Sequence, residues 1–321
     1  TARSHAMPTE IGVAAVDTLS EALKAVRMTS ALILNAEFSA PWGVTTDPAI
    51  VMPLLAPDAE RLVMYHLVIE GEAHVQIAGA PAVSLMPGDI VIIPHGDVHI
   101  FSYGSPPRLL DLTDDVFSNA SDLSLATHGG GGEMTRFVCG YFGCERRADR
   151  LFLAGLPQVI KVNIRGDAAG RWLEDSMRHL ASEVGDTRPG NRVLLSKMAE
   201  TLFIEALRRY MEQLTPEQTG WLAAAKDPVV GRALALLHRD PRHPWTAVEL
   251  AAQAGASRSV IAERFAHLLG ESPLGYLARW RMQLAARLLE STHSTMIQVA
   301  AEVGYESETA FSRAFSRDRA F

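Results

Sequence analysis

Four side chains in the first half of this chain have the chemistry for metal binding or redox control: His66, His99, Cys139 and Cys144. Thiolates and imidazoles are preferred ligands of tetrahedral zinc, so a two-Cys, two-His zinc site is one interpretation. A thiol redox switch without metal is a second, because the chain has only these two cysteines. Inert packing of small residues on a strand is a third. The sequence leaves the three open.

A second set of side chains has the chemistry to contact DNA, and an internal repeat positions it. The segment Leu250–Gly255 recurs as Val299–Gly304. Each copy is followed by a serine, Ser257 or Ser307, that can cap the next helix, and the glycine permits a tight turn. Helix, glycine turn and capped helix form the helix-turn-helix pattern. We therefore expect two such motifs.

Helical periodicity predicts which side chains of the second helix in each copy face outward. Those expected on the buried stripe are Val260, Ile261, Phe265, Ala310, Phe311 and Phe315. Those expected to face outward are Arg258, Ser259, Ala262 and Glu263 in the first copy and Glu308, Thr309, Ser312 and Arg313 in the second. A recognition helix presents such residues to base edges in the major groove, so these eight are the predicted DNA-binding residues. Two motifs on one monomer can enter successive grooves about 34 Å apart.

The distribution of charge agrees with a local DNA-binding surface. The whole chain has a formal net charge of −7, which is unlike a basic nucleic-acid binder. Residues 229–321 contain 11 arginines, no lysine and 9 acidic residues, a balance of +2, which leaves −9 for the rest. Positive charge is therefore segregated to the C-terminal region.

This C-terminal region resembles the DNA-binding domain of the AraC/XylS family of bacterial transcription regulators over about residues 229–315. The two motifs carry the resemblance together with Gly270–Leu274, Arg279–Met282, Ala285–Leu289 and Val303–Ser307. It implies that the family's base- and phosphate-contacting positions fall on the same eight residues, and that RNA polymerase is a partner. The sequence departs from the family by ending at Phe321, before a tail containing proline and aromatic residues, and by an acidic Glu263 where a basic or amide residue often stands.

The N-terminal half has the pattern of an all-β domain, with short apolar segments broken by Gly, Pro and Asp over about residues 30–162. The segment Gly88–His99 fits G-x5-P-x-G-x2-H and resembles the second motif of the cupin barrel. The first cupin motif normally offers two histidines and a glutamate, but Tyr65–Glu72 retains only His66 at an inward position. This argues against the alternative function, a cupin-fold metal-dependent enzyme with an accessory helical domain.

The β domain also resembles the cupin-type sensor domains that precede such DNA-binding domains. A sensor requires an effector site, for which Trp42, His66, His99 and Phe101 are the candidates. The expected signal is a small molecule, a metal or an oxidant. A constitutive architectural DNA binder would instead have no pocket in the barrel.

Helical periodicity begins after Gly170 and divides the remaining chain. Residues 170–213 are predicted to form a helical hairpin, and its apolar stripe of Leu194, Met198 and Leu202 is predicted to form a homodimer. Residues 214–228 contain two X-Pro steps and are the predicted linker.

The predicted fold is thus α+β and multidomain, with an N-terminal cupin-like β-barrel with appended helices and a C-terminal all-α tandem helix-turn-helix domain. Residues 1–7 are expected to be a vector remnant, 8–169 the sensor and 229–321 the DNA-binding domain. No apolar run approaches the roughly 20 residues of a membrane span, no signal peptide is evident, and two cysteines suit a reducing compartment. The sequence predicts a cytoplasmic, sequence-specific regulator of transcription that binds double-stranded DNA. It predicts no enzyme, and no cofactor other than the zinc of the first interpretation.

Overall fold

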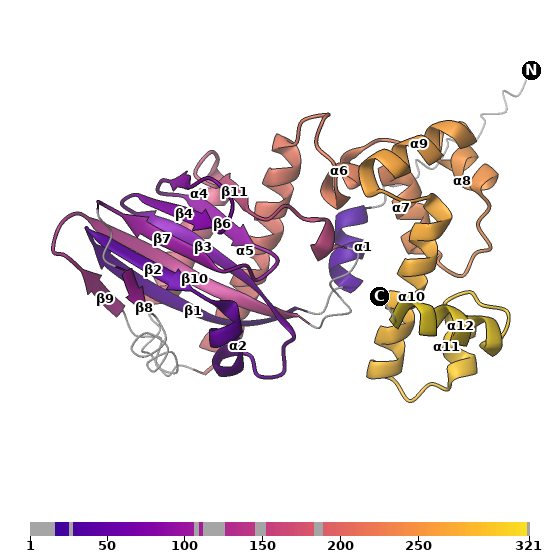
Figure 1. The fold of residues 1–321 in the computed structure, drawn as a ribbon, viewed down its shortest axis with the longest axis horizontal. Coiled ribbons are helices and arrows are strands. Elements are labelled where there is room, and N and C mark those ends of the chain that lie inside the picture. The colour runs from indigo at the N-terminus through magenta and orange to yellow at the C-terminus, as the bar shows by residue number, and fades with distance from the viewer. Residues whose placement is uncertain are drawn as a thin grey trace, which may run out of the picture. The chain divides into compact units, whose positions relative to one another are not determined.

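The computed structural model describes residues 17–25, 28–105, 109–111, 126–144, 152–182 and 189–319. The chain divides into two compact units (Figure 1). The barrel unit spans Val26–Ala223, and the helical unit combines Thr1–Ala25 with Ala224–Phe321.

The barrel unit contains two sheets. One has six strands in the order β11-β6-β3-β10-β1-β9, and the other has five in the order β5-β4-β7-β2-β8. The strands are β1 (Met28–Ser39), β2 (Trp42–Thr46), β3 (Arg61–Glu70), β4 (Ala73–Ile77), β5 (Val83–Leu85), β6 (Asp89–Ile93), β7 (His99–Tyr103), β8 (Leu109–Asp111), β9 (Ala126–Gly129), β10 (Met134–Cys144) and β11 (Ile160–Asn163). Helix α2 (Pro48–Leu55) connects β2 to β3. The sheet-rich, cupin-like domain predicted from the sequence is confirmed.

The core of the barrel unit lies between the two sheets. It contains Phe38, Val68, Val91 and Phe137 from the six-stranded sheet and Trp42, Val75 and Phe101 from the five-stranded sheet. In β4 buried residues alternate with exposed ones, as expected of a strand with one face in solvent. In β3 and β6, by contrast, nearly every residue is buried. The six-stranded sheet must therefore be covered on its outer face as well.

Helices α4 (Ala168–Ser182) and α5 (Asn191–Gln213) provide this cover and correspond to the predicted hairpin. Phe203 of α5 contacts Phe142 of β10, with ring centroids 5.1 Å apart. Leu202 beside it is only 1% exposed, whereas Leu194 is 50% exposed. The predicted dimer stripe is therefore wrong at Leu202, because that side chain belongs to the core of its own unit.

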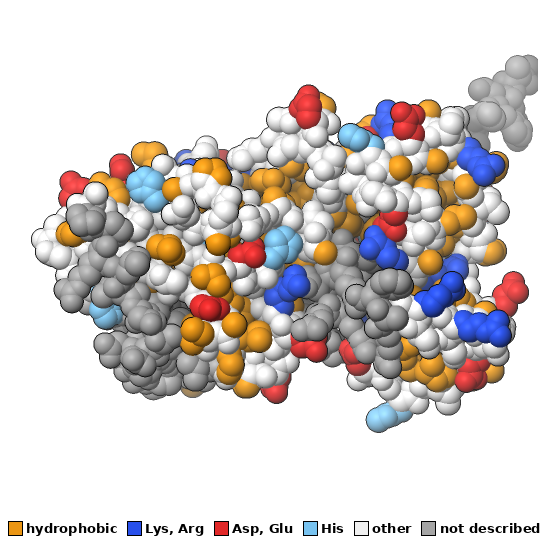
Figure 2. All heavy atoms as spheres, in the orientation of Figure 1, with side chains coloured by type: hydrophobic (Ala, Val, Ile, Leu, Met, Phe, Trp, Pro, Cys, Tyr) orange, Lys and Arg blue, Asp and Glu red, His pale blue; other side chains and the backbone are white. Residues whose placement is uncertain are grey.

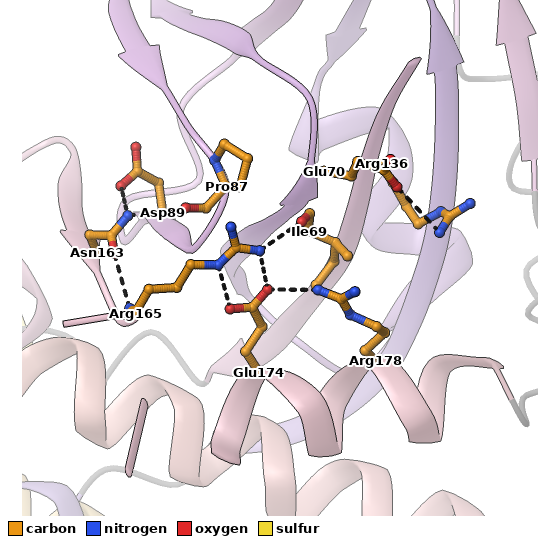
Figure 3. A network of polar contacts seen from close by, with 9 residues as sticks. All are labelled: Ile69, Glu70, Pro87, Asp89, Arg136, Asn163, Arg165, Glu174 and Arg178. Atoms are coloured by element: carbon orange, nitrogen blue, oxygen red, sulfur yellow. Dashed lines mark hydrogen bonds and ion pairs between the residues drawn. The ribbon is translucent and has the colours of Figure 1, made fainter. Parts of the chain in front are cut away.

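A buried carboxylate fixes α4 to the barrel (Figure 3). Glu174 accepts hydrogen bonds from Arg165 at 2.5 and 2.7 Å and from Arg178 at 2.9 Å. Arg165 also donates to the backbone oxygen of Ile69 near the end of β3, at 2.9 Å. Burial raises the pKa of Glu174, but the hydrogen bonds and charges of the two arginines outweigh it and hold this pKa below its ordinary value.

The predicted linker, residues 214–228, is not an open connection. It contains α6 (Trp221–Lys226), and the boundary between the units falls inside this helix, between Ala223 and Ala224. Trp221 is 1% exposed and packs edge-on against Phe152, with centroids 5.0 Å apart. Within the segment predicted to be a linker, the burial of the indole ring makes the stretch around Trp221 part of the packed structure.

The helical unit contains α1 (Thr18–Ala25), α7 (Val230–Arg239), α8 (Ala247–Ala254), α9 (Arg258–Leu269), α10 (Pro273–Ser291), α11 (Met296–Glu302) and α12 (Glu308–Arg319). Capping side chains define both motifs. Ser257 accepts a hydrogen bond from the backbone of Val260 at the start of α9, and Gly255 before it has φ 76°. At the start of α11, Thr295 and Gln298 form a complete capping box.

Helix α1 lies within residues 8–169, the range predicted for the sensor. It belongs to the helical unit, where it packs against α7. The sequence pattern of α1 could not identify α7 as its packing partner, because the two helices are more than 200 residues apart in sequence.

The burial of Leu202 of α5 generates a stability prediction. Leu202→Asp places a charge in the core and is expected to lower the free energy of unfolding by more than about 3 kcal/mol. Ile50→Asp of α2, at a position 50% exposed, is expected to change it by less than about 0.5 kcal/mol. Urea unfolding followed by circular dichroism measures both, and equal effects would contradict the packing of α5.

Candidate nucleic-acid interface and barrel site

The second helix of each motif, α9 and α12, presents the predicted DNA-binding residues to solvent. Seven of the eight are exposed, and Ser312 is half-buried. On the opposite side, Ile261 and Phe265 of α9 and Phe311 of α12 are fully buried. Each helix thus has one face fixed in the core and one free face, as a recognition helix requires.

Val260 and Ala310 depart from the predicted buried stripe. Val260 is 37% exposed, and Ala310 is also exposed. Each precedes a fully buried residue by one position, which rotates it about 100° away from the core. Their apolar character suggested burial, but an exposed Val260 on α9 can instead contact a thymine methyl group. It is a further candidate for base contact.

Hydrogen-bond partners separate the arginines of the helical unit into two groups. Arg264 pairs with Asp227 at 2.9 Å, Arg279 pairs with Glu271, and Arg281 donates to two backbone oxygens at 2.7 and 3.0 Å. Among the described residues, the exposed Arg258 and Arg313 have no hydrogen bond or ion pair. These two are therefore available for phosphate or guanine, whereas the paired arginines stabilise the fold.

Figure 2 shows basic side chains gathered on the drawn face of the helical unit and fewer of them over the barrel unit. The recognition helices also carry acidic residues. Glu263 on α9 and Glu308 at the start of α12 are both exposed. A carboxylate cannot bind phosphate, but it can accept a hydrogen bond from the N4 amine of cytosine. Among the eight predicted residues, each recognition helix therefore offers DNA one carboxylate and one arginine.

The second candidate site lies inside the barrel, around His66 of β3 and His99 of β7. Their rings are 5.4 Å apart, and Phe101 lies 4.5 Å from His66 and 5.5 Å from His99. Trp42, fully buried, joins the same interior through Phe137, with centroids 5.9 Å apart. The structure therefore brings the four predicted effector residues into one aromatic cluster.

Both histidines are uncharged at neutral pH. Burial lowers the pKa of His66 well below its ordinary value, and the neighbouring His99 lowers it further. Burial lowers the pKa of His99 to about 4, against a smaller opposite effect of Asp97. His99 Nδ1 lies 2.8 Å from the backbone oxygen of Asp97, so Nδ1 carries the proton. Nε2 of each ring is buried without a hydrogen-bond partner among the described residues.

The cysteines lie on opposite faces of β10. Cys139 is paired with His66 across β10 and β3, which places both side chains on the interior face. Cys144 is five residues further along a strand whose register with β3 is regular from Phe137 to Cys144, so it points to the other face. The predicted two-Cys, two-His zinc site is therefore not formed. Within the described residues no group of three or more His, Cys, Asp or Glu could hold a metal ion.

Burial also affects the chemistry of the Cys139 thiol. It is partly buried, and burial raises its pKa above the ordinary value. The reactive form of cysteine is the thiolate, which this environment disfavours. The sequence could not distinguish these possibilities, because it does not show whether the strand continues without a bend through Gly143. That continuation decides which face Cys144 occupies.

Comparison with known proteins identifies the family of the chain. Residues 17–212 match a family of the description Cupin, and residues 250–318 match a helix-turn-helix domain. A Streptomyces lividans protein described as an AraC-like transcription regulator is 32% identical over 261 residues, which cover 81% of this chain and 84% of that protein. The transcriptional regulator AlkR of Acinetobacter baylyi is 31% identical over 283 residues, covering 85% of this chain and 89% of AlkR.

Among solved structures, the DNA-binding domain of AdpA in complex with a target DNA is 32% identical, with a TM-score of 0.27 over 28% of this chain and 81% of that domain. The chain belongs to the AraC family of transcription regulators, with an N-terminal cupin domain and a C-terminal helix-turn-helix domain. Its relatives are regulators of transcription, so the alternative of a cupin enzyme is not supported. No helix in the described part of the chain is both long and apolar enough to cross a membrane.

The unpaired arginines generate a prediction about DNA binding. Arg313→Ala is expected to weaken operator binding by about 1–3 kcal/mol and to relax the preference at one base pair, because Arg can bind guanine O6 and N7. Arg279→Ala is the matched control, since that side chain is 46% exposed but paired with Glu271. Binding measured on a set of single-base operator variants tests this. A uniform loss on every sequence would assign Arg313 to phosphate instead.

The buried histidines generate a prediction about pH. The folded state keeps His99 unprotonated down to about pH 4, whereas the unfolded chain takes up a proton near pH 6.5, so the free energy of unfolding falls as pH decreases between these values. His99 alone accounts for about 3 kcal/mol. His99→Asn should flatten this pH dependence in urea unfolding, and His74→Asn, on the exposed side of β4, should not. An identical slope in both variants would contradict the burial of a neutral imidazole.

Proposed function

We propose that this AraC-family regulator senses a small molecule inside its barrel and responds by changing its binding to an operator. It acts in the cytoplasm as a homodimer on double-stranded DNA and communicates with RNA polymerase. A population shift accounts for the response: the effector stabilises one placement of the helical unit over others.

The chemistry of the barrel interior supports an uncharged effector. Two neutral imidazoles, each with an unpartnered Nε2, lie among the aromatic rings of Phe101, Phe137 and Trp42. A charged group would be costly to bury here, but a hydroxyl or N–H could donate to Nε2 of His99. The favoured effector is an apolar molecule, such as a phenol or aromatic alcohol, with one such donor.

The other two signals expected from the sequence, a metal and an oxidant, have less support. A metal would lack a third ligand among the described residues. One relative, the "RCS-specific" transcriptional activator RclR of Escherichia coli, is 26% identical over 258 residues. In this chain, however, burial raises the pKa of Cys139, and the two cysteines lie on opposite faces of one strand.

The exposed face of α5 supports a homodimer. Val193, Leu194 and Ile204 are 64%, 50% and 40% exposed. Lys197 pairs with Glu200 and Arg208 with Glu205 beside them, which neutralises much of the charge on this face. A second copy of the same face is the partner, since a two-fold interface matches a surface with itself.

A thermal-shift experiment tests the effector. A phenol or aromatic alcohol at about 100 times its Kd is expected to stabilise the chain by about 2.7 kcal/mol, seen as a rise in Tm of several degrees. His99→Phe should abolish the rise and leave operator binding without effector intact, while His74→Gln should preserve it. Stabilisation only by carboxylates, or stabilisation retained in His99→Phe, would overturn this assignment.

Sedimentation tests the dimer. Val193→Asp combined with Ile204→Asp is expected to convert the dimer into a monomer, because charges are introduced at the centre of the proposed interface. Ile50→Asp is the matched control, since Ile50 of α2 is also exposed, at 50%, but lies elsewhere on the barrel unit. A dimer that survives the double substitution would place the interface on another surface.

A further inference from the structure

Helix α7 is buried on nearly every side. Val230, Ala233, Leu234 and Leu237 are completely buried, and Ala235, Leu236 and His238 are less than 9% exposed. A helix that is apolar around its whole circumference requires neighbours in every direction. Helices α8, α9 and α10 supply some of them. Helix α1, from the other end of the chain, also packs on α7.

The contact between α1 and α7 has the features of an internal packing interface. Thr18, Leu19 and Ala22 lie on one face of α1 and are 7%, 8% and 1% exposed. Thr18 Oγ1 donates a buried hydrogen bond of 3.2 Å to the backbone oxygen of Gly231 in α7. The start of α1 is itself fixed, because Asp17 accepts a hydrogen bond from the backbone of Ser20 at 3.1 Å. The face of α1 that touches α7 is therefore apolar and specific in register.

Neither of the two family matches covers both α1 and α7. The cupin match begins at residue 17 and so includes α1, whereas the helix-turn-helix match begins at residue 250, after α7. In the structure α1 nevertheless belongs to the same compact unit as α7. We propose that α1 is a structural part of the DNA-binding unit that supports operator binding, and that the sensor is inserted into this unit between α1 and α7.

The insertion has a mechanical consequence. Only residues 26 and 27 separate α1 from β1, and β1 is paired on both sides, with β10 and β9. At the other end of the sensor, the boundary falls within the single helix α6. Both attachments are therefore short. Under this proposal, a displacement of β1 would act on α1 through a connection of two residues.

Hydrogen exchange on the full-length chain tests the packing role. Ala22→Asp places a charge against α7 and is expected to speed amide exchange in residues 230–239 at least tenfold, with exchange in β3 unchanged. Thr18→Val, which removes only the hydrogen bond to Gly231, is expected to speed it severalfold, and Thr18→Ser should restore protection. Ile50→Asp is the control for an added charge on a short helix of the barrel unit. Faster exchange in β3 but not in α7 would overturn the proposal, because α1 would then stabilise the sensor.

DNA binding by the same variants tests the functional part. With a duplex selected in vitro by the unmodified chain, Ala22→Asp is expected to weaken binding at least tenfold without any effector present, and Thr18→Ser to leave it unchanged. Unchanged or tighter binding by Ala22→Asp would overturn the proposal, since tighter binding would make α1 an inhibitory segment. This measurement requires neither an effector nor its site, so its failure is independent of the proposed sensing function.

Discussion

Burial of both faces of strands β3 and β10 is the constraint on which the barrel unit depends. One face of their six-stranded sheet packs against the five-stranded sheet and the other against α4 and α5. The layer under the helices is tight enough to require glycine at position 140, where a Cβ would lie 2.2 Å from the hydroxyl oxygen of Tyr65. Because strand alternation assigns each side chain to one of these two layers, it also separates Cys139 from Cys144. The same constraint that stabilises the sheet therefore excludes a site that uses both thiols.

Interactions between residues near in sequence were predictable, and interactions between distant residues were not. The capped helices of both motifs follow from Ser257 and Ser307, whose side chains accept hydrogen bonds from backbone N–H groups three residues away. The interior position of His66 and His99 follows from strand alternation and the cupin motif. The partner of α1, by contrast, lies more than 200 residues away, and nothing within eight residues of local pattern specifies it. The burial of Leu202 was missed for the same reason, since helical periodicity identifies an apolar face without identifying what covers it.

The core of the helical unit combines aromatic stacking with a neutral buried histidine. His238 of α7 stacks on Trp280 of α10, with centroids 4.0 Å apart, and its Nε2 lies 2.8 Å from the hydroxyl of Tyr276. Burial lowers the pKa of His238 to about 3, so the ring packs without charge. Tyr276 in turn contacts Phe265 of α9 edge-on, at 6.3 Å. Helix α7 thereby positions the first recognition helix through α10, which makes the completeness of its packing, including α1, relevant to DNA contact.

The distribution of paired arginines bears on how this protein obtains its affinity for DNA. Nonspecific binding depends on the number of DNA phosphates that the protein neutralises. An arginine that is paired within the fold does not neutralise a phosphate. Arg264, Arg279 and Arg281 are engaged within the fold, and Glu263 adds negative charge to α9. Fewer arginines of a single helical unit can therefore bind phosphate, and base contacts supply the discrimination between sequences. Two units linked in the proposed homodimer raise the effective concentration of the second at the operator, which increases affinity without loss of specificity.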